Sequence, residues 1–352
     1  MKRTRISISL VIAVVLVLLP AYSAAAQTSE KDEAVLQNKY HVIQVGDFDI
    51  QPGVDVPPNY LASLPQQLIQ RLKDSKKFAE VLATGEQPSQ DALVMRLSGT
   101  VTGYDQGSRG KRYVGFGMGA ARLFVTLKYS DKNTGQIIYQ DKVFGTLTGG
   151  LFGGNENKVV EELAKAILTT TKLVLLRRPG DPNNLVEQNA ATNPADRQTV
   201  EMKGDLKIVE NKLNELAEQG FRVADFRVTG NKSADVTMEK TATPPEIYHY
   251  RVVHAILVGN VQKNMNSAAA EGHRLVRHTV AMIGGLTLIM EKPPAPDSRY
   301  EYRVSSSMRS SNAEKHLVEE QQKGFVLAEA AELSGLNVVL TEKEIHVEEA
   351  NR

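Results

Sequence analysis

The feature that most constrains the fold is an internal repeat in the C-terminal part of the chain. Three glycines, Gly220, Gly272 and Gly324, follow one another at steps of 52 residues. The same step relates further pairs of identical residues: Met238 and Met290, Glu239 and Glu291, Tyr248 and Tyr300, Tyr250 and Tyr302, and Arg251 and Arg303. A period of this length encodes one small supersecondary unit that stacks on its neighbours. The pattern therefore predicts three copies of one module.

Each copy reads as strand, helix, strand, strand, over residues 199–240, 247–292 and 299–343. Apolar residues at helical spacing mark one buried helical face in the first copy: Leu206, Val209, Leu213, Leu216 and Ala217. Each repeated glycine follows such a helix, where a left-handed C-terminal cap favours glycine. The copies are predicted either to hang as beads on Pro-rich connectors or to pack through their sheets.

Two of the copies depart from the common pattern. The opening strand of the first copy is degenerate, with Val200 expected at the place of Val252 and Val304. In the third copy Ser311 and Glu314 have the spacing of a capping box at the start of its helix.

The N-terminal block, residues 38–178, reads as a mixed α/β sheet domain in the order β-α-β-β-β-β-α. Alternation over its longest strand predicts that four apolar side chains face the core: Leu93, Met95, Leu97 and Val101. Residues 179–198 are rich in Pro, Asn, Asp and Ala without an apolar period, which is typical of a linker. The predicted fold class is α+β, with this domain followed by three tandem βαββ repeats.

Residues 40–175 resemble a family of exported bacterial domains of unknown function. Its layout is that of the amino-terminal domain of TolB, the curli secretion pore subunit and the lipoprotein activators of penicillin-binding proteins. The resemblance rests on Gly46-Asp47-Phe48, Leu97 to Val101, the glycines 115, 117 and 119, the Asn133-Thr134-Gly135 turn, and Gly149 to Gly154. It implies a sheet with helices on one face and no catalytic residues.

The repeats resemble a second family of small bacterial domains of unknown function, for which no activity is implied. Its members open with Tyr-x-Tyr-x-Val-Val and carry a Leu-Asn-x-Leu helix. Residues 248–253 and 213–216 match these two motifs. An aromatic residue follows the glycine in the family, as Phe221 and Phe325 do here, whereas the middle copy has His273.

The first 26 residues read as a cleavable signal peptide. Basic residues precede an apolar run of 14 residues, Ile6 to Leu19, and Ala24 to Ala26 offer a cleavage site before Gln27. The run is shorter than the roughly 20 residues of a membrane-spanning helix, and no later stretch is long and apolar enough. The chain has no cysteine, which excludes lipid anchoring as a lipoprotein, disulfides and thiolate sites. We expect a periplasmic or extracellular protein.

Charge and motifs point away from nucleic acid and from known chemistry. The formal charge is +1, and three of the positive charges belong to the signal peptide, so no broad basic surface is predicted. The stretch Gly115 to Ala120 has the G-x-G-x-x-A spacing, but a strand rather than a helix follows it. Asp131-x-Asn133-x-Gly135 is interpreted as a hairpin turn, because a calcium loop needs a Glu where Lys142 stands. No catalytic, cofactor-binding or metal-binding residues are assigned.

The Gly-rich stretch is interpreted as the entry to the strand that follows it. The alternative is a contact loop for a partner or a membrane, containing Arg109, Lys111, Arg112, Phe116 and Met118. The leading hypothesis is a non-catalytic envelope protein that acts as an interaction or assembly module, since sheet edges in small modules are docking sites for another strand. Its expected partner is an envelope protein or a cell-wall component. A peptidoglycan- or glycan-binding protein is the main alternative, although Trp is absent. A hydrolase with an unrecognised acid pair and a pore-forming homo-oligomer stay open behind it.

Overall fold

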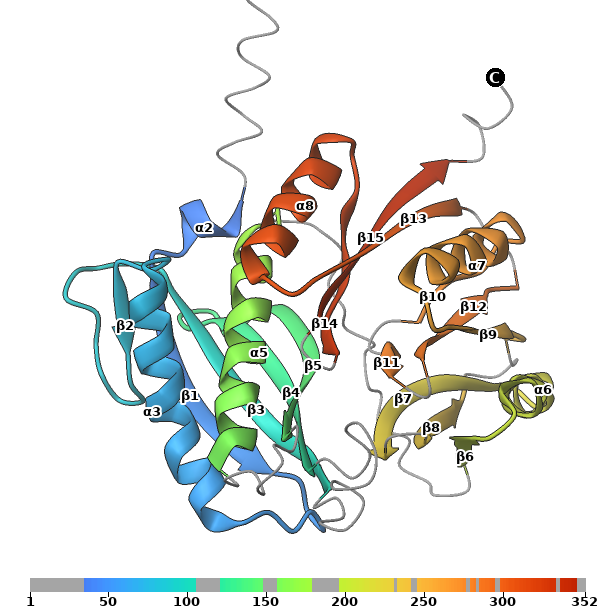
Figure 1. Cartoon of the computed structure of the whole chain (residues 1–352), viewed down its shortest axis with the longest axis horizontal. Coiled ribbons are helices and arrows are strands. Elements are labelled where there is room, and N and C mark those ends of the chain that lie inside the picture. The colour runs from blue at the N-terminus through green and yellow to red at the C-terminus, as the bar shows by residue number, and fades with distance from the viewer. Residues whose placement is uncertain are drawn as a thin grey trace, which may run out of the picture.

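The computed structural model (Figure 1) describes residues 35–105, 121–147, 157–178, 196–230, 233–241, 246–276, 279–282, 285–294, 298–333 and 336–346. They form an α+β protein with one five-stranded sheet and three small sheets. None of the helices within these ranges is long and apolar enough to cross a membrane.

The N-terminal domain is built on the five-stranded sheet, whose strands lie in the order β2-β1-β3-β4-β5. Their bounds are Val42–Ile50 for β1, Glu80–Leu82 for β2, Val94–Asp105 for β3, Ala121–Asp131 for β4 and Ile137–Leu147 for β5. β1 runs parallel to both β2 and β3, and the other neighbours are antiparallel. The short strand β2 is therefore one edge of the sheet.

Both long helices of this domain cover the same face of the sheet (Figure 1), in agreement with the layout that the resemblance implies. They are α3, Pro58–Ser75, and α5, Asn157–Leu175, and a short helix α2, Leu36–Lys39, precedes them. Proline at the start of α3 suits a first turn whose N–H groups have no intrahelical partner. Leu64, Leu68 and Leu72 recur on one face of α3 and are fully buried against the sheet.

Three modules follow the N-terminal domain, each opening with a strand and a helix; two strands follow in modules 1 and 3, and two short strands and a longer one follow in module 2. Module 1 contains β6 Arg197–Lys203, α6 Leu206–Glu218, β7 Phe221–Gly230 and β8 Ser233–Lys240. Module 2 contains β9 His249–Ala255, α7 Val258–Ala270, β10 Arg274–Leu275, β11 Ala281–Met282 and β12 Leu286–Lys292. Module 3 contains β13 Ser298–Ser307, α8 Ser310–Gln322, β14 Val326–Leu333 and β15 Leu336–His346. In each sheet the last strand lies between the other strands.

The modules pack through their sheets, so each core is shared with the next module. The apolar cluster of module 1 contains Tyr250 and Ile289 of module 2. The cluster of module 2 likewise contains Tyr302 and Leu340 of module 3. The interpretation as beads on flexible connectors is therefore wrong, because the outward faces of β9 and β13 are apolar and are buried on the preceding module.

A hydrogen-bonded clamp recurs at both boundaries between modules. The Asn214 side chain on α6 donates to the Tyr250 carbonyl at 2.9 Å and accepts from the Tyr250 N–H at 2.8 Å. In the next copy of the repeat, Asn266 on α7 makes the same two bonds to Tyr302 at 3.0 and 2.8 Å. Each clamp satisfies the open edge of the next module's first strand, which would otherwise expose unpaired backbone groups.

The tyrosine hydroxyls complete these boundaries by returning to the preceding module. The Tyr250 hydroxyl accepts from the Val223 N–H at 2.9 Å, and the Tyr302 hydroxyl accepts from the Leu275 N–H at 2.8 Å. Val223 in β7 and Leu275 in β10 occupy the same position in the repeat, in the strand that follows the helix. The equivalent position in module 3 is Leu327.

The N-terminal domain takes the place of a fourth module at Leu327. Arg177, which follows α5 and is 1% exposed, donates to the Leu327 carbonyl at 3.0 Å. Leu173 of α5 joins the apolar cluster of Leu317 and Leu327 in module 3, and α8 lies beside α5 (Figure 1). The Gln321 side chain also donates to the Leu176 carbonyl at 2.7 Å. The array of modules is thus closed on the domain that precedes it.

Three local predictions are wrong. Leu93 is 42% exposed, because β3 begins only at Val94. No capping box forms in module 3: Arg309 is the N-cap of α8 without a side-chain cap, and Glu314 pairs instead with Lys77 at 3.0 Å and Lys172 at 3.5 Å. The first strand of module 1 is shifted by one residue relative to the prediction. Thr199, not Val200, is equivalent to Val252, because Thr199 pairs with Thr237 and Val252 pairs with Ile289 at the corresponding place in module 2.

Candidate functional site

The residues singled out in the sequence fall into two groups. Arg109, Lys111, Arg112, Phe116 and Met118 of the expected contact loop lie outside the described residues. The repeated glycines lie at the helix ends, with φ of 85° at Gly220, 92° at Gly272 and 89° at Gly324. These are left-handed values that glycine adopts without a steric cost. Their role is therefore structural.

A hollow in the surface of the N-terminal domain lies beside β2, and sequence reasoning missed it. This cleft has a volume of about 680 Å³. Its lining comes from the end of α3, from β2 and from the following loop: Lys73, Phe78, Ala79, Glu80, Val81, Leu82, Glu86 and Gln87. We call it the β2 cleft. The sequence indicated the strand, but its position at the sheet edge depends on a parallel pairing with β1, which lies far away along the chain.

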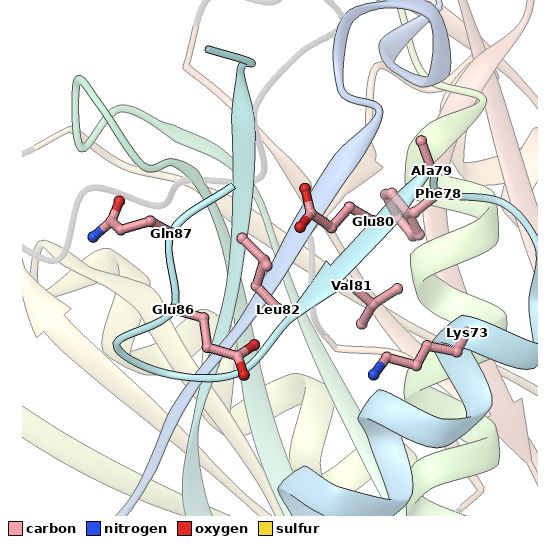
Figure 2. A pocket seen from close by; sticks show the side chains of 8 residues that line it. All are labelled: Lys73, Phe78, Ala79, Glu80, Val81, Leu82, Glu86 and Gln87. Carbon is pink, nitrogen blue, oxygen red and sulfur yellow. The ribbon is translucent and has the colours of Figure 1, made fainter. Parts of the chain in front are cut away.

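Figure 2 shows how the side chains of the β2 cleft are distributed around the strand. Val81 points to the same side as Lys73 of α3, whereas Glu80 and Leu82 point to the other side. Glu86 lies beyond the end of β2. The alternation follows from the period of two in a β-strand. The Lys73 ammonium of α3 thus lies beside one face of β2, and the Glu80 carboxylate lies on the other face.

The loop after β2 is held in place by the buried side chain of Gln44 in β1. Its amide donates to the carbonyls of Ala83 at 3.0 Å and Glu86 at 3.1 Å. The Glu86 carboxylate accepts from the Ala83 N–H at 2.7 Å, which closes the turn. Each of these bonds holds a backbone group of the loop. The loop that forms one side of the β2 cleft is therefore held in a single conformation.

Glu80 has its carboxylate directed by Ser89. The Ser89 N–H donates at 3.0 Å and the Ser89 hydroxyl donates at 2.8 Å. The backbone bond first, and the hydroxyl second, lower the pKa of Glu80 below its usual range. The group is therefore an anion at neutral pH and presents a fixed negative charge beside the open edge.

The lining of this cleft suits the recognition of an extended segment. Among the described residues there is no group of three or more His, Asp or Glu side chains that could hold a metal ion. The lining combines one lysine, two glutamates and apolar side chains along an extended backbone. Within the described part of the chain, β2 pairs with β1 alone. Its outer edge offers backbone donors and acceptors to another extended segment.

The remaining turn motif has a structural role as well. The Asp131 carboxylate accepts from the N–H groups of Asn133 at 3.0 Å and Thr134 at 2.9 Å. The Tyr40 hydroxyl donates to the same carboxylate at 2.9 Å. The stretch joins β4 to β5, so it is a hairpin turn stabilised by its own aspartate.

These features define the class of the molecule as an α+β protein with a sheet domain and three stacked βαββ modules. A family model described only as a domain of unknown function, DUF4410, matches residues 54–146, from just after β1 into β5. The N-terminal part of the chain therefore contains a match to an uncharacterised domain family. A comparison with curated proteins finds no match.

Several solved structures are similar to part of the chain. A PelC dodecamer from Paraburkholderia phytofirmans is 20% identical, with 36% of this chain and 86% of that chain covered and a TM-score of 0.25. A protein from Xanthomonas campestris is 14% identical, with 38% and 81% covered and a TM-score of 0.25. A hypothetical protein from Chlamydia trachomatis is 11% identical, with 38% and 95% covered and a TM-score of 0.29. Likenesses with TM-scores this low carry no functional argument.

Proposed function

We propose that this chain is a non-catalytic exported protein of the bacterial envelope that docks an extended segment of a partner protein on the edge of β2. The observation that carries the proposal is the cleft of about 680 Å³ along that edge. A partner strand there would continue the five-stranded sheet. Backbone hydrogen bonds would provide affinity, and the side chains that alternate across the edge would provide selectivity.

The surroundings of β2 support docking of a short segment. The strand is three residues long, so its edge has room for a short partner segment only. Lys73 and the carboxylate of Glu80 lie on opposite sides of the edge (Figure 2). A partner segment with an acidic residue on one side and a basic residue on the other would match both charges.

The predicted signal peptide, residues 1–26, supports a periplasmic or extracellular site of action. The absence of cysteine supports a protein released after export rather than anchored as a lipoprotein. The resemblance to the TolB, curli-pore and penicillin-binding-protein-activator layout supports an assembly role in the envelope. The partner is accordingly an envelope protein, with a cell-wall component as the alternative.

A photo-cross-linking scan in the native cell tests this proposal. A photoreactive amino acid is placed at Gln87 and, separately, at Glu86, both of which line the β2 cleft. Matched positions at Thr134 and Glu201 are exposed and lie outside the cleft. We expect one envelope protein to be cross-linked from both cleft positions and from neither matched position.

The cross-linked segment of that partner is then made as a peptide. Its binding should slow amide hydrogen exchange at Val81. The Glu80 N–H already bonds to the His41 carbonyl, and successive residues of a strand turn their N–H groups to opposite edges, so the Val81 N–H faces the partner segment. Equal cross-linking at the cleft and at the matched positions would refute the proposal. So would a bound peptide that leaves exchange in β2 unchanged.

A further inference from the structure

The closed arrangement contains four boundaries, and three of them are apolar. Module 1 meets module 2 through a shared cluster that includes Tyr250 and Ile289. Module 2 meets module 3 through Tyr302 and Leu340. Module 3 meets the N-terminal domain through Leu173 and its partners. These three boundaries are lined by buried apolar side chains and have the character of a domain core.

The fourth boundary, between module 1 and the N-terminal domain, is different. Strand β7 contacts β3 here. Yet none of the apolar clusters among the described residues contains side chains of both module 1 and the N-terminal domain. A cleft of about 200 Å³ lies in the boundary, lined by Gln51, Arg197, Ala224, Asp225, Thr237 and Glu239. This boundary is therefore polar and open to water, and we call its hollow the boundary cleft.

One lysine crosses the polar boundary. Lys142 of β5 donates through Nζ to the Asp225 carboxylate at 2.5 Å and to the Phe226 carbonyl at 2.7 Å. Both side chains are partly exposed, with 30% of Lys142 and 41% of Asp225 accessible. A charged donor with two acceptors is a stronger contact than a neutral hydrogen bond.

The sequence of module 1 explains why this boundary stays polar. In module 2, Tyr250 pairs with Glu291 across the sheet, and in module 3, Tyr302 pairs with Glu342. The same ladder position in module 1 is Arg197, which pairs with Glu239. The tyrosine that packs each later module on the one before it is thus replaced by a charged residue whose ion pair with Glu239 lies in the boundary cleft.

We propose that Lys142 and Asp225 form a latch that holds module 1 on the N-terminal domain, and that the ring of modules opens at this boundary. Opening separates the walls of the boundary cleft while the three apolar boundaries stay closed. The device exposes the polar face of module 1 formed by Arg197, Thr237 and Glu239. It is independent of the β2 cleft, so the two proposals stand or fall separately.

The cations around Asp225 favour its charged form. Burial by itself raises the pKa of Asp225, but the Lys142 ammonium and its hydrogen bond, with a smaller effect of Arg227, hold that pKa below its usual range. Arg197 and Glu239 of the same cleft neutralise each other. Asp225 is thus an anion at neutral pH, and because the Lys142–Asp225 pair is partly exposed, added salt weakens it by screening.

Cross-linking across the boundary cleft tests the latch in the full chain. The sequence has no cysteine, so Gln51→Cys and Ala224→Cys introduce the two reactive thiols, one on each side of the cleft. A short bis-maleimide joins them when the boundary is closed. Adding Lys142→Met, which keeps a long side chain and removes its charge, should slow cross-linking. The ratio of closed to open chains derived from the rates should fall about tenfold, the effect of losing one charged hydrogen bond.

The Lys142→Arg variant provides the matched control. It keeps the positive charge and N–H donors for both the Asp225 carboxylate and the Phe226 carbonyl, so its ratio of closed to open chains should stay within about threefold of the parent. Amide exchange at Tyr302 should stay at the parental rate in every variant, which distinguishes opening from unfolding. An unchanged rate in the Lys142→Met variant would overturn the proposal, as would a Lys142→Arg variant that cross-links no faster than the Lys142→Met variant.

Discussion

Substitution of Asn266 tests how strongly the hydrogen-bonded clamp joins modules 2 and 3. Its side chain satisfies both the carbonyl and the N–H of Tyr302, at 3.0 and 2.8 Å. The Asn266→Ala substitution leaves those two partly buried backbone groups without their partner. A buried polar group left unsatisfied costs roughly 1–3 kcal/mol. Two such groups lose their partner, and water can replace part of the lost bonding because the site is only partly buried. We therefore expect the free energy of unfolding to fall by about 2–4 kcal/mol in total.

Urea unfolding followed by circular dichroism measures this loss. Asn214→Ala removes the equivalent clamp on Tyr250 and should cost a similar amount. Asn260→Ala lies on the exposed side of the first turn of α7 and should change the free energy of unfolding by less than about 0.5 kcal/mol. Amide exchange at Tyr302 should accelerate in the Asn266→Ala variant. If Asn266→Ala were as mild as Asn260→Ala, the clamp would not hold the modules together.

Three further outcomes are expected. Gly324→Ala should cost about 1–2 kcal/mol of unfolding free energy, because φ is 89° while the added Cβ meets only ordinary contacts; a melting temperature equal to that of the parent would contradict this. Burial raises the pKa of Asp131, but the donated hydrogen bonds of Thr134 and its neighbours outweigh burial and hold the pKa below its usual range. Its stabilisation is thus present at neutral pH and lost as pH falls below about 4, so Asp131→Asn should shrink the difference between urea midpoints at pH 7 and pH 3; an unchanged difference would count against it. The Glu291 side chain is 5% exposed and forms ion pairs with Arg222 and Arg274. Glu291→Ala should lower the free energy of unfolding by about 2 kcal/mol, after allowing for the exposure of the two arginines. A urea titration that shows no loss would contradict a stabilising role of these ion pairs.

The module structure was readable from the sequence because it rests on local patterns. Helical spacing of apolar residues and the repeated glycine depend on a few neighbouring positions. The way in which the modules stack was not readable. Tyr250 and Tyr302 look like ordinary strand aromatics in the sequence, and their hydroxyls reach N–H groups 27 residues away.

Closure of the array depends on contacts that no local pattern encodes. Arg177 stands where α5 gives way to a polar connector, a place typical of a solvated basic residue, yet it is buried and bonds to the carbonyl of Leu327, 150 residues away. The β2 cleft was missed for a similar reason. A strand of three residues can be predicted locally, but its place at the edge depends on the order in which distant strands pair.

Glu314 shows how tertiary structure overrides a local rule. Its spacing from Ser311 favours a capping box, which would satisfy the free N–H groups of α8. Two lysines of the N-terminal domain, Lys77 and Lys172, lie within 3.0 and 3.5 Å of its carboxylate instead. The ion pairs draw the side chain away from the helix end, so the motif predicts a cap that the fold replaces with a domain contact.

Small-angle X-ray scattering tests most directly the central claim that the N-terminal domain and the three modules form one closed body. The chain from residue 35 onward is measured in dilute solution. A compact chain of this length has a radius of gyration of about 20 Å, and we predict a value close to it. A radius of about 30 Å, with the extended distance distribution of separate modules on flexible connectors, would contradict the closed arrangement.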